Sequence, residues 1–153
     1  MSAKIMAFIQ ARMTSSRLPG KVMLNIAGKQ MLQLMLDQVR KAKSLDDVVV
    51  ATTTDPSDDI LEQFCQERNI PYHRGNLQDV LDRFYQAANK FRADVIVRLT
   101  ADCPLIDPQV LDRTVSTFLG NISSQAPDPD SLIPDPLESF HPAPGAFDFA
   151  ANR

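Results

Sequence analysis

A basic loop near the N-terminus is the first segment whose residue types could do chemistry. Between Ile9 and Val22 the sequence reads QARMTSSRLPGK, which holds three cations (Arg12, Arg17 and Lys21), three hydroxyl side chains and no carboxylate. Fixed positive charges with hydroxyl and backbone donors suit a polyphosphate, because its charged oxygens accept strong hydrogen bonds. The loop has neither the Gly-x-x-x-x-Gly-Lys-Ser/Thr spacing of a P-loop nor the Gly-x-Gly-x-x-Gly of dinucleotide enzymes. The residues alone leave two interpretations, a phosphate-binding loop and a solvated surface loop.

An aspartate far along the chain is the candidate metal ligand. Asp102 comes just after an apolar run at residues 95–99, and the basic loop comes just after a similar run at residues 5–9. Because the carboxyl ends of parallel strands lie at one edge of a sheet, we expect the two segments to converge on one crevice. Magnesium binds through one or two protein carboxylates together with substrate phosphates, which makes Asp102 a candidate ligand. A turn-capping role before Pro104 is the alternative.

Other residues that often do chemistry have ordinary structural interpretations. Asp55 and Asp107 each precede a proline, which is typical of an acidic N-cap followed by proline at the first helical position. Cys65 and Cys103 have no histidine in a recognisable nucleophile arrangement, so we expect them to be packed or incidental. For His73 we expect ordinary packing or solvent contact.

Alternating strands and helices must position these groups. Residues 5–9, 48–52 and 95–99 are short apolar runs without a polar face, which predicts strands buried on both sides of a parallel sheet. Residues 70–73 predict a shorter strand. With a helix after each strand, the order indicates an α/β fold with a doubly wound, mostly parallel sheet and right-handed crossovers.

Apolar residues at helical spacing predict the four helices, the last of which ends at Gly120. The acid-proline pairs mark where the second and the fourth begin. Leu32, Met35, Leu36 and Val39 form a stripe on the first helix that could cover the sheet. We expect Ile60, Leu61, Phe64 and Cys65 on the inner face of the second helix, and Leu111, Val115 and Phe118 on that of the fourth. The third helix is predicted from Val80, Leu81, Phe84, Tyr85 and Ala88.

Composition narrows the class of protein. The 153 residues are 44% apolar and 23% charged, as in a soluble globular domain. Lys and Arg number 16 against 19 Asp and Glu, which argues against a nucleic-acid-binding protein, because that affinity depends on surplus cations. No apolar run approaches the roughly 18 residues of a membrane span, so we expect no membrane role. Two cysteines and no apolar leader predict a reduced, cytoplasmic protein.

The amino-acid composition of the chain changes near residue 120. Residues 121–153 hold six of the 11 prolines and five acidic residues against one basic residue. Proline interrupts both helix hydrogen bonding and strand pairing, and charge opposes collapse. The sequence therefore predicts an α/β domain at residues 1–120 and an extended or disordered Pro-rich acidic tail at residues 121–153.

The amino-acid sequences of three segments point to a protein family more specifically than their charge does. The pattern Ala11-Arg12-x-x-Ser15-x-Arg17-Leu18-Pro19-x-Lys21 resembles the signature of the sugar cytidylyltransferases, which include the synthetases of CMP-sialate and CMP-3-deoxy-manno-octulosonate. Within that family, residues 74–88 (RGNLQDVLDRFYQAA) and 98–106 (RLTADCPLI) are most similar to the spore coat polysaccharide biosynthesis branch. The resemblance extends over residues 3 to 119.

This resemblance implies a nucleotide-diphospho-sugar transferase-like fold and a reaction. CTP and the hydroxyl of a sugar or sugar acid would give a CMP-sugar and pyrophosphate, with magnesium as the cofactor. Arg12 and Lys21 would be the catalytic cations that hold the triphosphate, and Asp102 would be the magnesium ligand. The residues that the resemblance assigns to the nucleotide are Ala11, Arg12, Ser15, Arg17, Lys21, Gly75 and Arg83.

The resemblance stops where the tail begins. Members of the family are longer, and their second half supplies more of the sugar pocket, a second magnesium carboxylate and much of a dimer interface, none of which is recognisable here. We expect a truncated or frame-shifted relative, with a shortened nucleotide-binding protein and an engineered fragment as alternatives. An uncovered sheet edge would favour a homodimer or other self-association.

Two hypotheses about function therefore stand. One is a cytidylyltransferase, with turnover impaired by the missing half. The other is a non-catalytic nucleotide-binding or interaction module, whose tail recruits a partner through Phe140, Phe147 and Phe149.

Overall fold

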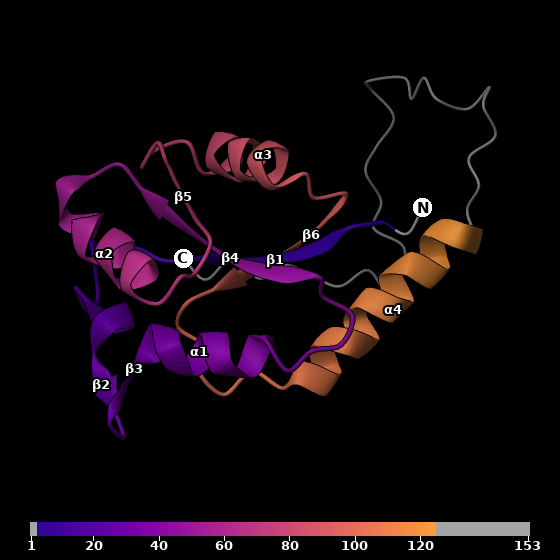
Figure 1. The fold of residues 1–153 in the computed structure, drawn as a ribbon, viewed down its shortest axis with the longest axis horizontal. Coiled ribbons are helices and arrows are strands. Elements are labelled where there is room, and N and C mark those ends of the chain that lie inside the picture. The colour runs from indigo at the N-terminus through magenta and orange to yellow at the C-terminus, as the bar shows by residue number, and fades with distance from the viewer. Residues whose placement is uncertain (1–2, 125–153) are drawn as a thin grey trace.

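A parallel sheet forms the centre of the fold in the computed structural model, which describes residues 3–124 (Figure 1). Its strands stand in the order β5-β4-β1-β6, and every neighbouring pair is parallel. The strands are β1 (Ile5–Gln10), β4 (Asp47–Thr53), β5 (Tyr72–Gly75) and β6 (Val95–Thr100). The predicted α/β fold with a doubly wound, mostly parallel sheet is confirmed.

Helices connect the strands in the predicted order. One helix follows each strand of the sheet, and a small antiparallel hairpin stands between the first strand and the first helix. The helices are α1 (Met31–Val39), α2 (Asp59–Glu67), α3 (Val80–Phe91) and α4 (Pro108–Ser124), the hairpin strands are β2 (Asn25–Ile26) and β3 (Lys29–Gln30), and the 3-10 turns are η1 (Lys21–Met23) and η2 (Pro56–Asp58).

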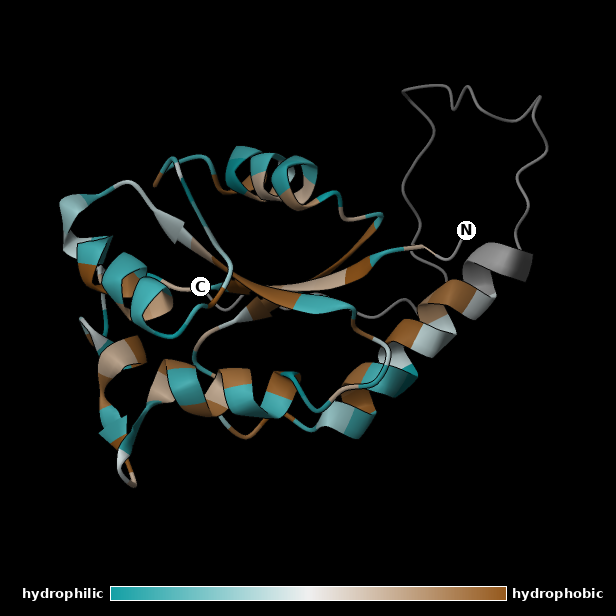
Figure 2. Ribbon diagram, in the orientation of Figure 1, coloured by the Kyte–Doolittle hydropathy of each residue, from teal (hydrophilic) through white to brown (hydrophobic). Residues whose placement is uncertain are grey.

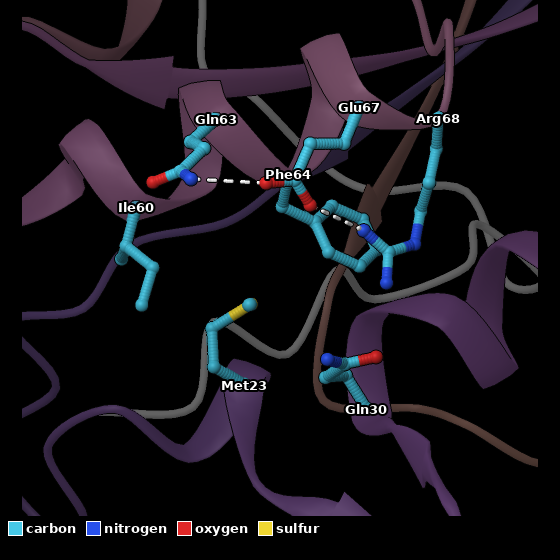
Figure 3. Close-up of a pocket in the computed structure, with 7 residues that line it drawn as sticks. All are labelled: Met23, Gln30, Ile60, Gln63, Phe64, Glu67 and Arg68. Atoms are coloured by element: carbon cyan, nitrogen blue, oxygen red, sulfur yellow. Dashed lines mark hydrogen bonds and ion pairs between the residues drawn. The ribbon is translucent and has the colours of Figure 1, made fainter.

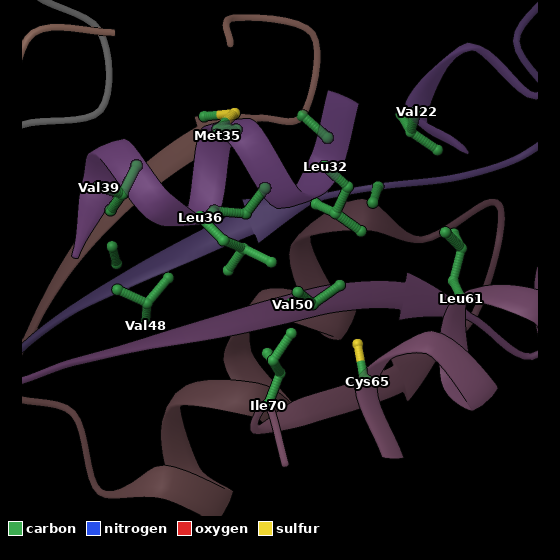
Figure 4. Close-up of a cluster of buried hydrophobic side chains, with 14 of the residues drawn as sticks. Val22, Leu32, Met35, Leu36, Val39, Val48, Val50, Leu61, Cys65 and Ile70 are labelled. Carbon is green, nitrogen blue, oxygen red and sulfur yellow. The ribbon is translucent and has the colours of Figure 1, made fainter. Parts of the chain in front are cut away.

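Helices cover both faces of the sheet, with α1 and α4 on one face and α3 on the other (Figure 1). The strands are the most hydrophobic layer (Figure 2). On the α1 face, Leu36 packs in one cluster with Val48 and Val50 of β4 (Figure 4). On the α3 face, the rings of Phe8 and Phe84 meet edge to face, with centroids 6.2 Å apart. Burial on both sides explains the continuous apolar runs at residues 5–9 of β1 and 48–51 of β4.

The prediction that residues 95–99 are buried on both faces is wrong. Along β6, half-buried and exposed residues alternate, and Ile96 is 40% exposed. In the described part of the chain, β6 pairs with β1 alone and stands at the edge of the sheet. On the α3 face, that helix packs mainly over β4 and β5, which leaves the same face of β6 open. An apolar run shows that a strand is suited to burial. Whether the strand is buried depends on the strands and helices that pack against it.

Two side chains expected on inner helix faces are exposed instead, since Ile60 is 46% exposed and Phe118 51%. Leu81 and Tyr85 of the third predicted helix are also exposed, at 82% and 61%. On α2 the buried stripe is Leu61, Phe64 and Cys65, and on α3 it is Arg83, Phe84 and Ala87. Each helix has two apolar stripes, and the periodicity did not show which one faces the sheet.

The last helix is longer than expected. The predicted end at Gly120 is wrong, because α4 continues to Ser124. A glycine inside a helix costs about 1 kcal/mol relative to alanine but does not end the helix. The rest of the predicted tail lies outside the described residues. Among helices of residues 3–124, none has the length and apolar content to cross a bilayer.

Candidate functional site

The loops that follow the strands begin together at the carboxyl edge of the sheet. The amide of Ala11 donates to the carbonyl of Ala51 at 3.0 Å, which joins the exits of β1 and β4. The amide of Ala101 donates to the carbonyl of Gln10 at 3.0 Å, which joins the exits of β6 and β1. Such bonds fix the relative positions of segments that are far apart in the sequence.

The basic loop closes on itself at a narrow neck. The carbonyl of Met13 accepts hydrogen bonds from the amides of Ser15, at 3.0 Å, and Gly20, at 2.8 Å. Gly20 has φ of +71°, a left-handed conformation that favours glycine, and a Cβ there would lie 3.3 Å from the Cε of Met13. The hydrogen bond between Met13 and Gly20 forms this neck. Arg12 precedes the neck in the sequence and Lys21 follows it, so the two cations lie at its two ends.

The basic loop meets the loop after β6 through an ion pair. The Lys21 Nζ lies 2.6 Å from the Asp102 Oδ2, and the two side chains are 27% and 42% exposed. Hydrogen bonds from Lys21 and Thr100 lower the pKa of the Asp102 carboxyl, so the group is ionised at neutral pH. The predicted convergence of the two segments is confirmed.

The other two cations of the loop are open to solvent. Arg12 and Arg17 are exposed, and neither forms a hydrogen bond or an ion pair with another described residue. Ser15 is half-buried, and Ala11 is buried at the exit of β1. Guanidinium groups without a protein partner keep all their donors available to an incoming oxyanion.

Gly75 and Arg83 lie against each other on the α3 face. A Cβ on Gly75 would lie 2.7 Å from the Cγ and 2.9 Å from the Cβ of Arg83, so only glycine fits the close approach. Arg83 is 1% exposed, and its Nη1 donates to the carbonyl of Asn76 at 2.8 Å. Burial lowers the pKa of its guanidinium. Arg83 therefore reaches the site through the backbone of the loop after β5.

Asp58 is a buried group at this edge that the sequence did not reveal. It is fully buried, its Oδ1 accepts from the amide of Met13 at 2.7 Å, and its Oδ2 accepts from the hydroxyl of Thr53. In the sequence it resembles a first-turn acid after the Asp55 cap. An available indication was its spacing, because Asp58 shares a helical stripe with the buried Leu61 and Cys65.

A second missed group is an arginine network below the same edge. The Nε of Arg74 donates to the carbonyl of Thr53 at 2.7 Å, and its Nη2 lies 2.7 Å from the Asp59 Oδ1. Its Nη1 pairs with Glu62. The Arg74 contacts tie β5 to β4 and α2, so all three nitrogens of this guanidinium are used within the fold.

Arg98 on β6 makes a separate contact, in which its Nη2 donates to the Gln10 Oε1 at 2.9 Å.

The ordinary interpretations of the acidic caps and of the first cysteine are confirmed. The Oδ1 of Asp55 accepts from the Ser57 amide at 2.9 Å, and the Oδ1 of Asp107 accepts from the Gln109 amide at 2.8 Å. Cys65 is buried, which raises the pKa of its thiol to about 12, so it is inert as a nucleophile.

The donor set around Asp102 fits a hard cation that brings its own ligands. Within residues 3–124 no three histidine, cysteine or acidic side chains gather as a metal site. A lone ionised carboxylate beside open cations suits magnesium bound to phosphates, because this ion keeps several substrate and water ligands.

A small surface pocket lies elsewhere. It is formed between α2 and the η1–β3 segment, where the side chains of Phe64 and Met23 meet (Figure 3). None of the predicted site residues lines it. It is therefore separate from the loops that meet at the carboxyl edge of the sheet.

Comparison with known proteins agrees with this geometry. The model of the family described as Cytidylyltransferase matches residues 6–128. The chain belongs to the cytidylyltransferase family. This family member is 40% identical over 112 residues to the spore coat polysaccharide biosynthesis protein SpsF of Bacillus subtilis strain 168, which covers 71% of the chain and 47% of that relative.

Two solved structures share the fold. A cytidylyltransferase from Leptospira borgpetersenii is 41% identical with a TM-score of 0.74, over 78% of this chain and 50% of that one. A CMP:2-keto-3-deoxy-manno-octonic acid synthetase complexed with CTP is 30% identical with a TM-score of 0.65, over 80% and 48% of the two chains. This cytidylyltransferase-family chain thus spans about half the length of the relatives it matches.

Proposed function

We propose that this chain forms the CTP-binding half of a nucleotidyltransferase that couples CTP to a sugar or sugar acid and releases pyrophosphate. The product would serve the synthesis of a cell-surface polysaccharide. The observation that carries the proposal is the meeting of Lys21 and Asp102, 2.6 Å apart at the carboxyl edge of the sheet. Support also comes from the CTP in the related synthetase and from the role that the name of SpsF states.

In the proposed reaction the protein mainly positions and neutralises charge. The sugar hydroxyl oxygen forms a bond to the α-phosphorus, and the bond from that phosphorus to pyrophosphate breaks. Negative charge grows on the phosphoryl oxygens and on the leaving group, and fixed cations lower the barrier. Arg12 and Lys21 supply these cations from the two ends of the neck, with Ser15 and Arg17 in the same loop.

Magnesium is the proposed cofactor, with Asp102 as its protein ligand. Once bound with the triphosphate, the ion would neutralise phosphate charge. The contact between Lys21 and Asp102 keeps the Asp102 carboxyl ionised and holds it against the basic loop. We place the reaction in the cytoplasm, in keeping with two cysteines that form no disulfide.

A second candidate is a nucleotide-binding module without turnover. It is favoured by one observation, the match to about half of each relative. Residues that select the sugar would then have to come from outside the described chain.

Two measurements on the full chain separate these candidates. Titration calorimetry with CTP, UTP, ATP and GTP in the presence of magnesium should show binding of CTP in preference to the others. Pyrophosphate release with candidate sugars then reports turnover. Binding with release supports the enzyme, and binding without release supports the module. The absence of binding to any of the four nucleotides would contradict both.

A further inference from the structure

Two buried side chains of opposite charge lie beneath the loops of the site. Asp58 is fully buried and Arg83 is 1% exposed. The Asp58 charge favours the protonated form of Arg83, whereas the charges of Arg12 and Arg98 oppose it. A chain of contacts also joins the two groups. Asp58 accepts from the Thr53 hydroxyl, Thr53 stands beside Gly75 in the sheet, and Gly75 lies against Arg83.

Asp58 anchors the basic loop to the sheet. Its two carboxylate oxygens accept from the Met13 amide, at 2.7 Å, and from the Thr53 hydroxyl at the end of β4. The carbonyl of the same Met13 closes the neck of the loop by accepting from Gly20. One residue of the loop thus carries both the closure and the anchor, and a shift of Asp58 would move the entire neck.

Arg83 anchors the loop after β5 in the same way. Its Nη1 donates to the Asn76 carbonyl at 2.8 Å, and its stem fills the space over Gly75. The Asn76 Oδ1 in turn accepts from the Gln78 amide at 2.8 Å, and the Asp79 side chain caps α3. The Nε of Arg83 is buried and has no partner in the described chain.

Stability does not explain this arrangement. Burying a charge is costly, and replacing a buried pair with apolar residues often leaves a protein equally stable. Buried side chains that hydrogen-bond to backbone groups do, however, fix the geometry of the segments that they join. Here the joined segments are two loops that follow β1 and β5 at the carboxyl edge of the sheet.

We propose that Asp58 is a positioning residue of the nucleotide site, which fixes the basic loop through Met13 and couples it to the loop at residues 75–79 through Thr53, the neighbour of Gly75 in the sheet. The inference deepens the proposed function and rests on it for the identity of the ligand. The coupling itself is a property of the free protein.

The test compares Asp58→Asn with Asp58→Ala and the control Asp59→Asn in the full chain. Asparagine keeps an acceptor for the Met13 amide but removes the charge, whereas alanine removes both. Asp59 is the neighbouring carboxylate, 66% exposed and paired with Arg74, outside the site. Calorimetry with magnesium and CTP should show about tenfold weaker binding for Asp58→Asn, a larger loss for Asp58→Ala and less than a twofold change for Asp59→Asn.

Amide resonances of the free protein give a readout that needs no ligand. In Asp58→Asn the Met13 amide should shift upfield as it loses a charged acceptor, and the amides of residues 75–79 should shift with it. Asp59→Asn, which removes a partner of Arg74 next to Gly75, should leave the Met13 amide and the amides of residues 76–79 unchanged. If Asp58→Ala does not fold, Thr53→Val takes its place. This variant removes one hydrogen bond of the Asp58 carboxylate and keeps its charge, so it should weaken CTP binding less than Asp58→Asn does.

Either of two results would overturn the proposal. One is unchanged resonances at residues 75–79 in Asp58→Asn, which would show that the loops are not coupled. The other is wild-type CTP affinity in Asp58→Asn while the Met13 amide shifts. A wild-type chain that binds none of the four nucleotides would instead refute the proposed function, and the free-protein resonances would still decide whether the loops are coupled.

Discussion

Lys21 holds the contact on which the proposed function depends, so its replacement is the most direct test at the scale of the residue. Lys21→Ala removes a cation that the proposed function assigns to the triphosphate, and it leaves the Asp102 carboxylate without its ion-pair partner. We predict at least about tenfold weaker CTP binding, equivalent to about 1.4 kcal/mol. Calorimetry checks it, with Lys29→Ala as the control, because Lys29 forms an exposed ion pair with Asp37. Wild-type affinity would remove Lys21 from the site.

His73 gives a pH-dependent prediction at the same scale. Its Nε2 is buried without a partner in the described chain, and burial lowers the pKa of the imidazole. The unfolded chain therefore binds the proton more readily than the folded chain, and stability is lost as pH falls below about 6.5 toward the folded pKa.

The measurement is urea unfolding between pH 7.5 and pH 5. We predict that the wild type loses more stability across this range than His73→Gln, which has no group that titrates there. Parallel curves for the two proteins would show that the imidazole is not buried as a neutral ring.

At the scale of the element, the close approach of β5 to α3 is the most sensitive point. A methyl group at Gly75 would fall within 3.2 Å of the backbone of Arg83 as well as its side chain, so strand and helix must move apart. We predict that Gly75→Ala lowers the free energy of unfolding by about 1–3 kcal/mol and weakens CTP binding through the displaced loop.

Gly120→Ala is the matched control for that substitution. Gly120 lies inside α4 with open space around it, so alanine there should raise helix stability slightly. Urea unfolding measures both variants. Equal stabilities of Gly75→Ala and the wild type would show that the loop after β5 is loose enough to yield.

Element order was predictable, but burial and some contacts were not. Apolar runs and the acid-proline caps located the strands and two helix starts, and strand order brought Lys21 and Asp102 together. The exposure of Ile96 depends on β6 being an edge, which no local pattern records. Asp58 acts through the backbone of Met13, 45 residues away in the chain, so its role exists only after folding.

At the scale of the whole molecule, the position of β6 as an edge strand among the described residues has a measurable outcome. Unpaired strand edges with apolar neighbours tend to pair with other chains, and β6 carries the exposed Ile96. We predict concentration-dependent self-association in sedimentation velocity, reduced by Ile96→Lys without a change in the circular dichroism spectrum. A wild-type chain that stays monomeric up to high concentration would contradict this.

The closed neck between Met13 and Gly20 has a thermodynamic consequence for ligand capture. A loop that is already shaped before its ligand arrives gives up little conformational entropy on contact, because that entropy was lost during folding. Association would then be fast and governed by long-range attraction, slowing steeply as ionic strength rises. The left-handed backbone at Gly20 thus bears on how quickly a ligand binds to the loop, as well as on how tightly.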